Sequence, residues 1–422
     1  MVMDAQAIFQ AAEKSKLLGD PYVSKVWETV NDPSLFERSP DYLMELRKGL
    51  FRESLQFFAR HSRHYAELFE RLSIAPSDAE LGDLAKLAVP SDILRGEGQK
   101  PLLIDDVEPG GEYFKSSGTS GKEPVKVYRS PLDLAVMIKA NTDLFEYVYG
   151  RHLEEGKGVA LFMAAPELRY RLSFVAFVQL ALERKDIELI YGMDLLEGAE
   201  NGVPWQKLEP NRDRILKFLK SGEEPKLFFT APAGVYLMAK QFDEMGLFKK
   251  LGYRLASGAP PVRLGRGGLV VTGGGTKGFS DLPPYPDIVE LSAKHFVAGG
   301  RNEARSPAPF MDVLGMTETL TALIDRYGAM DKVPHPLSEV FLLDPKTFKP
   351  VREEGKQGIV GIFNPFTTSW LEVFYPGDLM VAKRSSRYYG REFSFVRRLT
   401  TDEGWDLQRA CGGSMEEMMR GK

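Results

Sequence analysis

The sequence predicts an α/β protein with layered sheets and helices in a large N-terminal domain, a β subdomain, and a short, truncated C-terminal segment. Two observations support this prediction. Between residues 131 and 272, apolar strand-like segments alternate with segments of helical periodicity, a pattern typical of α/β layering with largely parallel pairing. From about residue 337, apolar segments follow one another with short turns and little helix between them, which indicates an antiparallel β subdomain.

The chain has 422 residues, which is too long for one ordinary hydrophobic core. We expect a helical N-terminal region over residues 1–95 and a core over residues 96–380 that includes the β subdomain. Residues 381–422 form the short C-terminal segment, and this segment carries Cys411.

Composition excludes several classes of function. Hydrophobic residues make up 43% and charged residues 27% of the chain, as in soluble globular proteins. The net charge of −4 leaves no basic excess for nucleic acid, and no apolar run is long enough to span a membrane. The N-terminus lacks a basic start and an apolar signal core, and the lone Cys411 excludes an internal disulfide framework. We therefore expect a cytoplasmic protein.

The N-terminal region is expected to be helical because apolar residues recur at helical spacing from Tyr42 to Phe58 and from His64 to Phe69. After it, residues 102–104 are expected to form a short strand that leads into a loop of glycines and hydroxyls. Residues 125–128 alternate as the returning strand.

The alternating region and the β subdomain are expected to contain regular elements that follow from apolar periodicity and turn residues. The predicted helices are residues 131–149 (amphipathic), 172–182, 211–219 and 235–245, and the predicted strands are residues 158–163, 187–191, 226–230, 269–272, 339–343, 358–363 and 378–382.

The first motif is the loop from Tyr113 to Pro124. Its glycines let the backbone bend so that its N–H groups converge on an anion, its hydroxyls add donors, and its lysine adds a mobile positive charge. These groups are Ser116, Ser117, Gly118, Thr119, Ser120, Gly121 and Lys122. The loop has the chemistry needed to hold a triphosphate, but it is not a Walker A loop, because Glu123 stands where Ser or Thr is required. The alternative is a solvated turn between two strands.

The second motif places Gly273, Gly274 and Gly275 directly after a predicted strand. These glycines also satisfy the dinucleotide fingerprint, which requires a helix that begins inside the glycines. Pro283 and Pro284 follow too soon for such a helix. The motif therefore indicates a glycine loop whose bare backbone can lie against a flat base or a ribose.

The third motif runs from Asp312 to Thr319, and the fourth from Phe374 to Leu379. A carboxylate beside nucleotide phosphate suits a hard cation, and a carboxylate also suits two hydroxyls because both of its oxygens accept hydrogen bonds. The structural alternatives are a Thr-capped helix start for the third motif and a Pro-Gly-Asp turn for the fourth.

These four motifs, in this order, resemble those of the adenylate-forming superfamily, which includes acyl-CoA synthetases, peptide-synthetase adenylation domains and firefly-type luciferases. The resemblance implies that the first two motifs bind ATP together with Gly315, Met316 and Thr317, and that Thr317 and Lys122 contact phosphate. It also implies that Glu318 holds Mg²⁺ and that Asp378 accepts hydrogen bonds from the ribose. Leu314 departs from the pattern, since an aromatic residue that stacks on adenine is usual there.

The end of the chain is similar to a narrower family, the acyl-protein synthetase of the bacterial luminescence fatty acid reductase complex. The similarity lies in the Arg409-Ala410-Cys411 stretch before an acidic segment, in Val-Pro-His-Pro at residues 333–336, and in the Gly-Gly-X-Lys of the second motif. The chain ends 44 residues after Asp378, where full-length superfamily members continue with a separate C-terminal domain.

This resemblance implies that a fatty acid is activated to acyl-AMP and that the acyl group passes to a protein thiol, with Cys411 as the acceptor in this chain. An acyl-accepting reductase or a carrier protein is the expected partner.

Two alternatives remain open at this stage. One is an acyl- or aryl-CoA ligase similar to phenylacetate–CoA ligase, and the other is a non-catalytic binding partner that keeps the nucleotide fold. The retained charges of Lys122, Glu318 and Asp378 argue against the binding partner. Residues 162–166 and 174–177 either line an acyl pocket or belong to the core.

Overall fold

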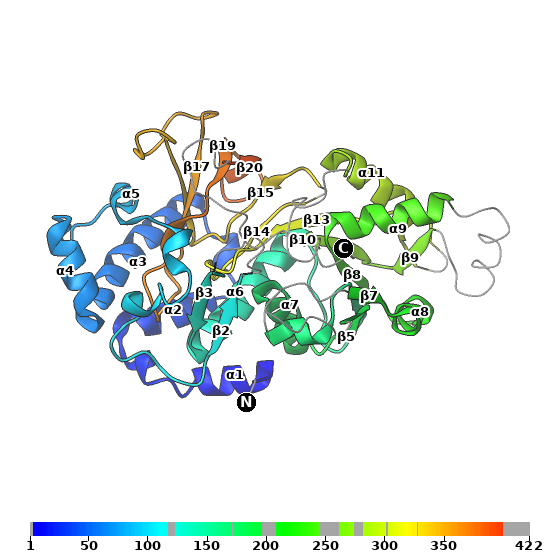
Figure 1. The fold of residues 1–422 in the computed structure, drawn as a ribbon, viewed down its shortest axis with the longest axis horizontal. Helices are drawn as coiled ribbons and strands as arrows, with labels where there is room; N and C mark the ends of the chain where they lie inside the picture. The colour runs from blue at the N-terminus through cyan, green and yellow to red at the C-terminus, as the bar shows by residue number, and fades with distance from the viewer. Residues whose placement is uncertain are drawn as a thin grey trace.

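The computed structural model describes residues 3–116, 123–170, 172–195, 208–244, 261–273, 282–300, 303–326 and 328–399. Within these ranges the protein is a mixed α/β structure with two large sheets. Figure 1 places helices α3, α4 and α5 at one end of the molecule and helices α8, α9 and α11 at the other.

The described α-helices are α1 (Ala5–Ala12), α2 (Pro21–Val30), α3 (Pro40–His61), α4 (Arg63–Arg71), α5 (Leu84–Leu87), α6 (Pro131–Tyr149), α7 (Ser173–Arg184), α8 (Arg212–Lys220), α9 (Pro232–Glu244) and α11 (Tyr285–His295). The short 3-10 helices are η1 (Lys16–Gly19), η2 (Leu35–Glu37), η3 (Leu81–Asp83), η4 (Ser91–Leu94), η5 (Lys100–Leu102) and η6 (Pro166–Tyr170).

The described strands are β1 (Val89–Pro90), β2 (Glu112–Lys115), β3 (Lys126–Arg129), β4 (Val159–Phe162), β5 (Glu188–Tyr191), β6 (Met193–Leu195), β7 (Leu208–Pro210), β8 (Lys226–Thr230), β9 (Val262–Gly265), β10 (Leu269–Gly273), β11 (Phe296–Ala298), β12 (Ser306–Pro307), β13 (Phe310–Leu314), β14 (Leu323–Ile324), β15 (Asp331–Lys332), β16 (Glu339–Leu343), β17 (Gln357–Phe363), β18 (Val373–Tyr375), β19 (Asp378–Arg384) and β20 (Arg391–Arg398).

A six-stranded sheet in the order β14-β13-β10-β8-β4-β5 forms the α/β half of the described structure. Strands β13, β10, β8, β4 and β5 pair in parallel, and only β14 is antiparallel to its neighbour. Every residue of β4, β8 and β10 is buried. The near-continuous apolar runs of these strands are what a parallel sheet with both faces covered requires.

A seven-stranded sheet in the order β1-β18-β17-β19-β20-β15, with β16 paired to β17, forms the β subdomain. Its pairs are antiparallel apart from β1 with β18. The N-terminal helices share a hydrophobic core with this sheet. The rings of Phe51 and Phe363 meet edge to face at 5.2 Å, and the Tyr22 hydroxyl donates to the Pro365 carbonyl at 2.7 Å. These helices therefore cover the sheet.

Most of the predicted elements are confirmed. Helix α6 begins and ends where the sequence predicts, because Ser130 caps its first turn and Gly150 ends it in the left-handed conformation with φ of 70°. The helix is not amphipathic, however. Its first half packs into the core of the N-terminal helices and its second half into the core of the six-stranded sheet, so it is buried on nearly all sides.

The strand predicted over residues 102–104 is wrong. Residues Lys100–Leu102 form the 3-10 helix η5, and Leu103 makes only an isolated bridge to Trp370. Pro101 explains the difference, because its fixed φ suits a helical first turn and it has no N–H for a strand ladder. The strand that leads into the first motif is β2 instead, which pairs antiparallel with β3.

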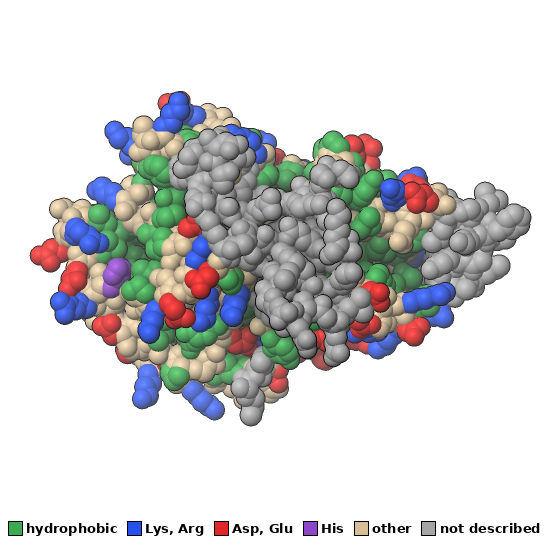
Figure 2. All heavy atoms as spheres, viewed as in Figure 1, with side chains coloured by type: hydrophobic (Ala, Val, Ile, Leu, Met, Phe, Trp, Pro, Cys, Tyr) green, Lys and Arg blue, Asp and Glu red, His purple; other side chains and the backbone are tan. Residues whose placement is uncertain are grey.

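In the ranges that the structure describes, no helix is both long and apolar enough to cross a membrane. On the face shown in Figure 2, basic and acidic side chains of the described residues are interspersed rather than gathered by sign. The division of the chain at residues 95 and 380 stays a prediction.

His335 is a buried histidine with 1% of its surface exposed. Its ring meets Phe36 at 5.3 Å and Phe366 at 4.8 Å, both edge to face, and its Nδ1 accepts a hydrogen bond from the Leu337 amide at 3.3 Å. Burial, with a smaller effect of Lys139, lowers the pKa of His335 to about 3. The imidazole is therefore neutral at physiological pH.

We expect His335 to make the protein less stable in acid. Between about pH 6.5 and the lowered pKa of about 3, His335 is protonated in the unfolded chain but stays neutral in the native protein. The free energy of unfolding therefore falls as the pH falls. From about pH 7 to about pH 5 this contribution is on the order of 2 kcal/mol.

Urea unfolding at both pH values measures this effect. The His335→Gln variant should lose that part of the pH dependence, while His152→Gln, at an exposed histidine, should keep it. Equal pH dependence in wild type and His335→Gln would contradict the assignment.

Candidate active site

The second and third motifs meet at one edge of the six-stranded sheet. Gly273, the last residue of β10, pairs with Val313 of β13, so the loops that follow both strands start side by side. The carboxyl edge of a parallel sheet is where α/β proteins place their ligands. Gly274 and Gly275 lie outside the described residues, as do Ser117 to Lys122 of the first motif.

A buried ion pair holds the loop after β13. Arg129 Nη1 lies 2.7 Å from Glu372 Oε2, and the two side chains are 1% and 0% exposed. Arg129 Nη2 donates to the Glu318 carbonyl at 2.7 Å, and the Leu320 amide donates to Glu372 Oε1 at 2.8 Å. Each charge of the pair therefore also binds the backbone of the loop. Buried charges are tolerated when they are paired and hydrogen-bonded in this way.

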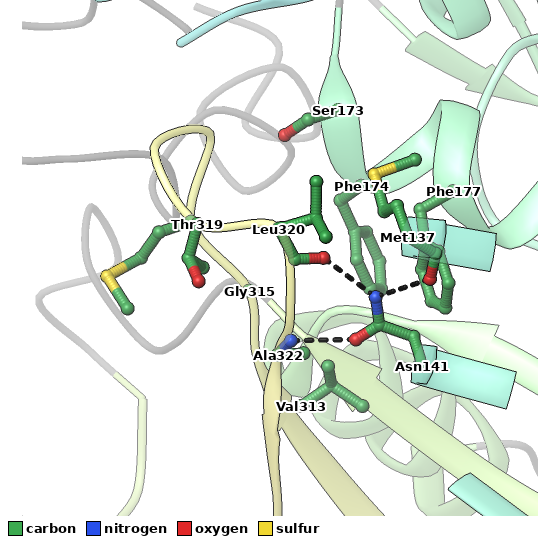
Figure 3. A pocket seen from close by; sticks show the side chains of 11 residues that line it. Met137, Asn141, Ser173, Phe174, Phe177, Val313, Gly315, Thr319, Leu320 and Ala322 are labelled. Atoms are coloured by element: carbon green, nitrogen blue, oxygen red, sulfur yellow. Dashed lines mark hydrogen bonds between the residues drawn. The ribbon is translucent and has the colours of Figure 1, made fainter. Parts of the chain in front are cut away.

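Two buried amides hold the other end of the same loop. Asn141 of α6 donates to the Leu320 carbonyl at 2.8 Å and accepts from the Ala322 amide at 2.7 Å, as Figure 3 shows. Asn364 donates to the Thr319 hydroxyl at 2.7 Å and accepts from the Thr321 hydroxyl at 2.7 Å. The loop is therefore bonded from α6 on one side and from the β17–β18 turn on the other.

A buried charge network ties β10 to β13 beneath the loop. Lys332 Nζ lies 2.5 Å from Asp312 Oδ2, and the Thr272 hydroxyl donates to Asp312 Oδ1 at 2.7 Å. Asp325 joins them, with its Oδ2 3.8 Å from Lys332 Nζ. Burial and the nearby Asp312 carboxylate raise the pKa of Asp325 to about 6, although Lys332 opposes the rise. Thr272 and Asp312 thus connect the second motif directly to the third.

Thr317 and Glu318 are buried within this loop, with 3% and 0% of their surfaces exposed. The Thr317 hydroxyl lies 3.4 Å from the hydroxyl of Ser173 at the start of α7. Among the described residues, no cluster of three or more acidic, histidine or cysteine side chains holds a metal by itself. In proteins, Mg²⁺ is usually bound by one or two carboxylates together with phosphate oxygens, so the Mg²⁺ role of Glu318 stays a prediction.

Ser116 closes the base of the first motif. Its amide donates to the Val125 carbonyl at 2.8 Å, and the Val125 amide donates back to its hydroxyl oxygen at 2.8 Å. The Ser116 hydroxyl therefore accepts a hydrogen bond from the backbone of β3's flank, and its predicted contact with phosphate stays a prediction. The hairpin strand that follows, β3, ends at Arg129, so the first motif is joined to the loop after β13 by the buried ion pair.

Asp378 is buried at 1% exposure and begins β19. The turn before it depends on Gly377, whose φ of 87° is costly for any other residue. Asp378 follows Glu372 closely in the chain, with only β18 and this turn between them. Because Glu372 is bonded to the loop after β13 and to Arg129, the fourth motif is connected to that loop through the same ion pair.

A small apolar cavity of about 40 Å³ opens beside this loop (Figure 3). Its lining includes Met137, Phe177 and Leu320, with Phe174 between two predicted site glycines. A Cβ at Gly273 would lie 2.8 Å from the Phe174 ring, and one at Gly315 3.9 Å from it. Gly273 therefore leaves room for the ring by having no side chain, whereas a Cβ at Gly315 would make only an ordinary van der Waals contact with it. Met316 also lines the cavity.

The two apolar segments flagged by the sequence have different places. Phe174 and Phe177 line the cavity, whereas Phe162 is wholly buried behind Phe174, with the two rings edge to face at 5.7 Å. Residues 162–166 therefore belong mainly to the core. Cys411 lies outside the described residues, and its role stays a prediction.

Sequence reasoning missed the residues that hold the site. No recognisable sequence pattern marks Arg129, Asn141, Ser173 or Glu372. Their partners are far away in the chain: Ser173 contacts Thr317, 144 positions on, and Asn141 bonds Leu320, 179 positions on. Arg129 and Glu372 are 243 positions apart. The available signal was a charged residue in an otherwise apolar segment: Arg129 ends strand β3, and Glu372 directly precedes β18.

Comparison with known proteins identifies the fold. No protein-family model matches the sequence, and no curated protein matches it either. Among solved structures, 2-hydroxyisobutyryl-CoA ligase in an open conformation with 2-HIB-AMP and CoA matches with a TM-score of 0.55, 17% identity, 84% of this chain covered and 69% of the ligase.

The same ligase in its postadenylation state with 2-HIB-AMP matches with a TM-score of 0.57, 16% identity, 84% of this chain covered and 68% of the ligase. The thioesterification state gives a TM-score of 0.54 at 17% identity, over 84% of this chain and 66% of the ligase. The predicted fold class is therefore confirmed. This chain has the fold of an adenylate-forming ligase.

Breaking the Arg129–Glu372 pair should be costly. We expect Arg129→Met to lower the free energy of unfolding by about 3–5 kcal/mol, because it leaves a buried carboxylate without its cation. Urea denaturation followed by tryptophan fluorescence measures the loss. The matched control is Arg63→Met, which removes an exposed pair with Glu67 and should cost less than about 1 kcal/mol.

A double variant, Arg129→Met with Glu372→Leu, should recover part of that stability because it removes both buried charges. An Arg129→Met protein that unfolds like the Arg63→Met control would show that the pair does not hold the loop.

Proposed function

We propose that the protein activates a fatty acid with ATP and passes the acyl group to a protein thiol. The single observation that carries the activation step is the buried Thr317–Glu318 loop. It lies at the carboxyl edge of a sheet with the adenylate-forming fold, beside an apolar cavity. This combination supports a site in which Thr317 would bind phosphate and Glu318 would hold a metal ion, next to space for an acid.

In this proposal the substrate carboxylate attacks the α-phosphorus of ATP, forming acyl-AMP and releasing pyrophosphate. The protein contributes charge neutralisation and in-line positioning. The groups of residues 116–122, with Lys122, bind the phosphates, Thr317 donates its hydroxyl to phosphate, and Asp378 accepts from the ribose. Glu318 would hold Mg²⁺, which would supply positive charge to the phosphates.

The rigidity of the site supports this mechanism. The backbone around Thr317 and Glu318 is bonded to Arg129, Glu372 and Asn141. Groups that are held in place before the reaction do not have to reorganise as negative charge moves from the carboxylate to pyrophosphate.

The cavity beside the Thr317–Glu318 loop bears on the size of the acid. The cavity lined by Phe174 and Phe177 is apolar, which suits a hydrocarbon group beside the reacting carboxylate. A volume of about 40 Å³ holds only a few water-sized groups. A long acyl chain therefore requires the cavity to widen by movement of one of these rings, and an acid panel from short to long chains measures how far it does.

The acceptor of the acyl group separates two enzymes. The resemblance of the segment around Cys411 supports transfer to a protein thiol, with a reductase or carrier protein as partner and the cytoplasm as the place of action. The structures of 2-hydroxyisobutyryl-CoA ligase with CoA support the alternative, an acyl- or aryl-CoA ligase. A non-catalytic binding partner remains the third possibility, and an exchange assay separates it from both enzymes.

The activation step predicts a defined loss in two variants. Lys122→Ala and Glu318→Gln should each slow ATP–pyrophosphate exchange by roughly 10- to 100-fold, since one charge-assisted contact contributes about 1.5–3 kcal/mol. Glu318→Gln should in addition require more Mg²⁺. The control is Lys157→Ala, which removes an exposed lysine paired with Glu154 and should exchange like the wild type.

If folded Lys122→Ala and Glu318→Gln proteins both exchange pyrophosphate at the wild-type rate, the site is assigned to the wrong residues. Absence of exchange with every acid of the panel would favour the binding partner.

The transfer step predicts a covalent adduct on Cys411. After incubation with ATP and a fatty acid, intact-mass measurement should show one acyl group on the wild type, removable by hydroxylamine, and none on Cys411→Ser. A thiolate attacks an acyl adenylate readily and yields a thioester that can be passed on, and Cys411 is the only thiol in the chain.

Both proteins should still exchange pyrophosphate, since Cys411 acts after activation. Acyl-AMP formation without an adduct, together with efficient transfer to free CoA, would replace this proposal with the CoA ligase.

A further inference from the structure

A second cleft lies at the opposite edge of the six-stranded sheet. It has a volume of about 450 Å³ and is bordered by Gly268, where β10 is about to start, and by Pro309, where β13 is about to start. The cleft therefore sits at the amino ends of strands whose carboxyl ends carry the predicted nucleotide motifs. Strands of this length rise about 3.3 Å per residue, so roughly 13 Å of sheet separates the two places.

Three arginines line the cleft, namely Arg151, Arg266 and Arg326, against a single carboxylate among the described lining residues, Glu303. Glu303 is already engaged, because it forms a salt bridge with Arg266 and accepts from the Gly300 amide at 2.9 Å. The Gly300 amide and the Arg266 guanidinium hold the pKa of Glu303 below its ordinary value. Within the described lining, Arg151 and Arg266 thus present guanidinium groups to the cleft, and the carboxylate beside them is already bonded.

Two glycines in the left-handed region let the guanidinium groups rest against bare backbone. Gly267 has φ of 73°, and a Cβ there would lie 2.3 Å from Arg151 Nη1. Gly150 has φ of 70°, and a Cβ there would lie 3.4 Å from Arg326 Nη1. A side chain at Gly267 would therefore displace the Arg151 guanidinium, whereas one at Gly150 would reach only ordinary contact distance from Arg326.

The turn that carries Arg266 and Gly267 is itself fixed. The Tyr149 hydroxyl donates to the Gly267 carbonyl at 2.5 Å, and the amides of Gly268 and Gly299 donate to the Gly265 carbonyl at 3.1 and 3.0 Å. Because this side of the cleft is already ordered, less conformational entropy is lost when a ligand binds.

We propose that this cleft binds a small phosphate-bearing anion at a site separate from the nucleotide site. Guanidinium groups match phosphate because their N–H donors form paired, charge-assisted hydrogen bonds with its oxygens. A phosphate dianion offers more acceptor oxygens to such groups than one carboxylate does, and chloride offers none. The volume falls within the roughly 300–1,000 Å³ of small-molecule pockets, so it also accommodates a phosphate ester.

The test is isothermal titration calorimetry with two probes, inorganic phosphate and glycerol 3-phosphate, at constant ionic strength set with sodium chloride. We expect saturable binding that persists in Lys122→Ala, which removes the lysine of the first motif. Arg151→Gln should weaken binding on the order of tenfold, the usual effect of one lost charge-assisted contact. Arg266→Gln should weaken it further, because it also releases the Glu303 carboxylate toward the phosphate.

Both arginines are exposed, so the variants should fold, and circular dichroism checks that they do. The matched control is Arg263→Gln, an exposed arginine of β9 outside the lining, which should bind both probes like the wild type. Tighter binding of glycerol 3-phosphate than of inorganic phosphate would identify a phosphorylated metabolite as the ligand, and the reverse order would identify free phosphate.

Equal affinity in wild type, Arg151→Gln and Arg266→Gln would overturn the proposal. So would binding that disappears in Lys122→Ala alone, because the phosphate would then sit at the first motif. The experiment measures binding rather than pyrophosphate exchange. Its failure would therefore contradict this inference without contradicting the acid-activating function.

Discussion

The buried ion pair of Arg129 and Glu372 is the interaction on which the candidate active site depends. It joins the end of the β2–β3 hairpin to the residue before β18, and both side chains bind the backbone between Glu318 and Leu320. Burial raises the pKa of the Glu372 carboxyl above its ordinary value, although Arg129 opposes the rise. Removing two charges from water is unfavourable, and the pair is tolerated because each charge also satisfies a backbone group.

This arrangement makes the site a property of the assembled protein. The first motif is anchored through β3, the third through the loop after β13, and the fourth through the segment from Glu372 to Asp378. All three lie on different sheets, so the side chains of these motifs come together only when the sheets pack against one another. The Thr272–Asp312–Lys332 network adds the second motif to the same structure.

The six-stranded sheet uses its two edges differently. Its carboxyl edge carries hydroxyls, a buried carboxylate and an apolar cavity, while its amino edge carries arginines set on glycine turns. The parallel direction of the strands explains the separation, because it sends every motif that follows a strand to one edge and every turn that precedes a strand to the other.

The sequence by itself determined the elements whose signals are local. Ser130 and Gly150 set the ends of α6, apolar alternation located most of the strands, and the chemistry of the four motifs pointed to ATP before any fold was known. The same reasoning failed at residues 102–104, where Leu102 ends a 3-10 helix and Leu103 makes only an isolated bridge, because a short apolar run does not distinguish a strand from a buried turn.

Only the tertiary structure decided which residues meet. Arg129 and Glu372 are 243 positions apart, and Asn141 and Leu320 are 179 apart. The burial of α6 on nearly all sides and the gathering of Arg151, Arg266 and Arg326 around one cleft are likewise invisible in the sequence. The physical reason is that propensity and capping act over a few neighbouring residues, whereas the partner of a buried charge is chosen by the packing of sheets and helices from distant parts of the chain.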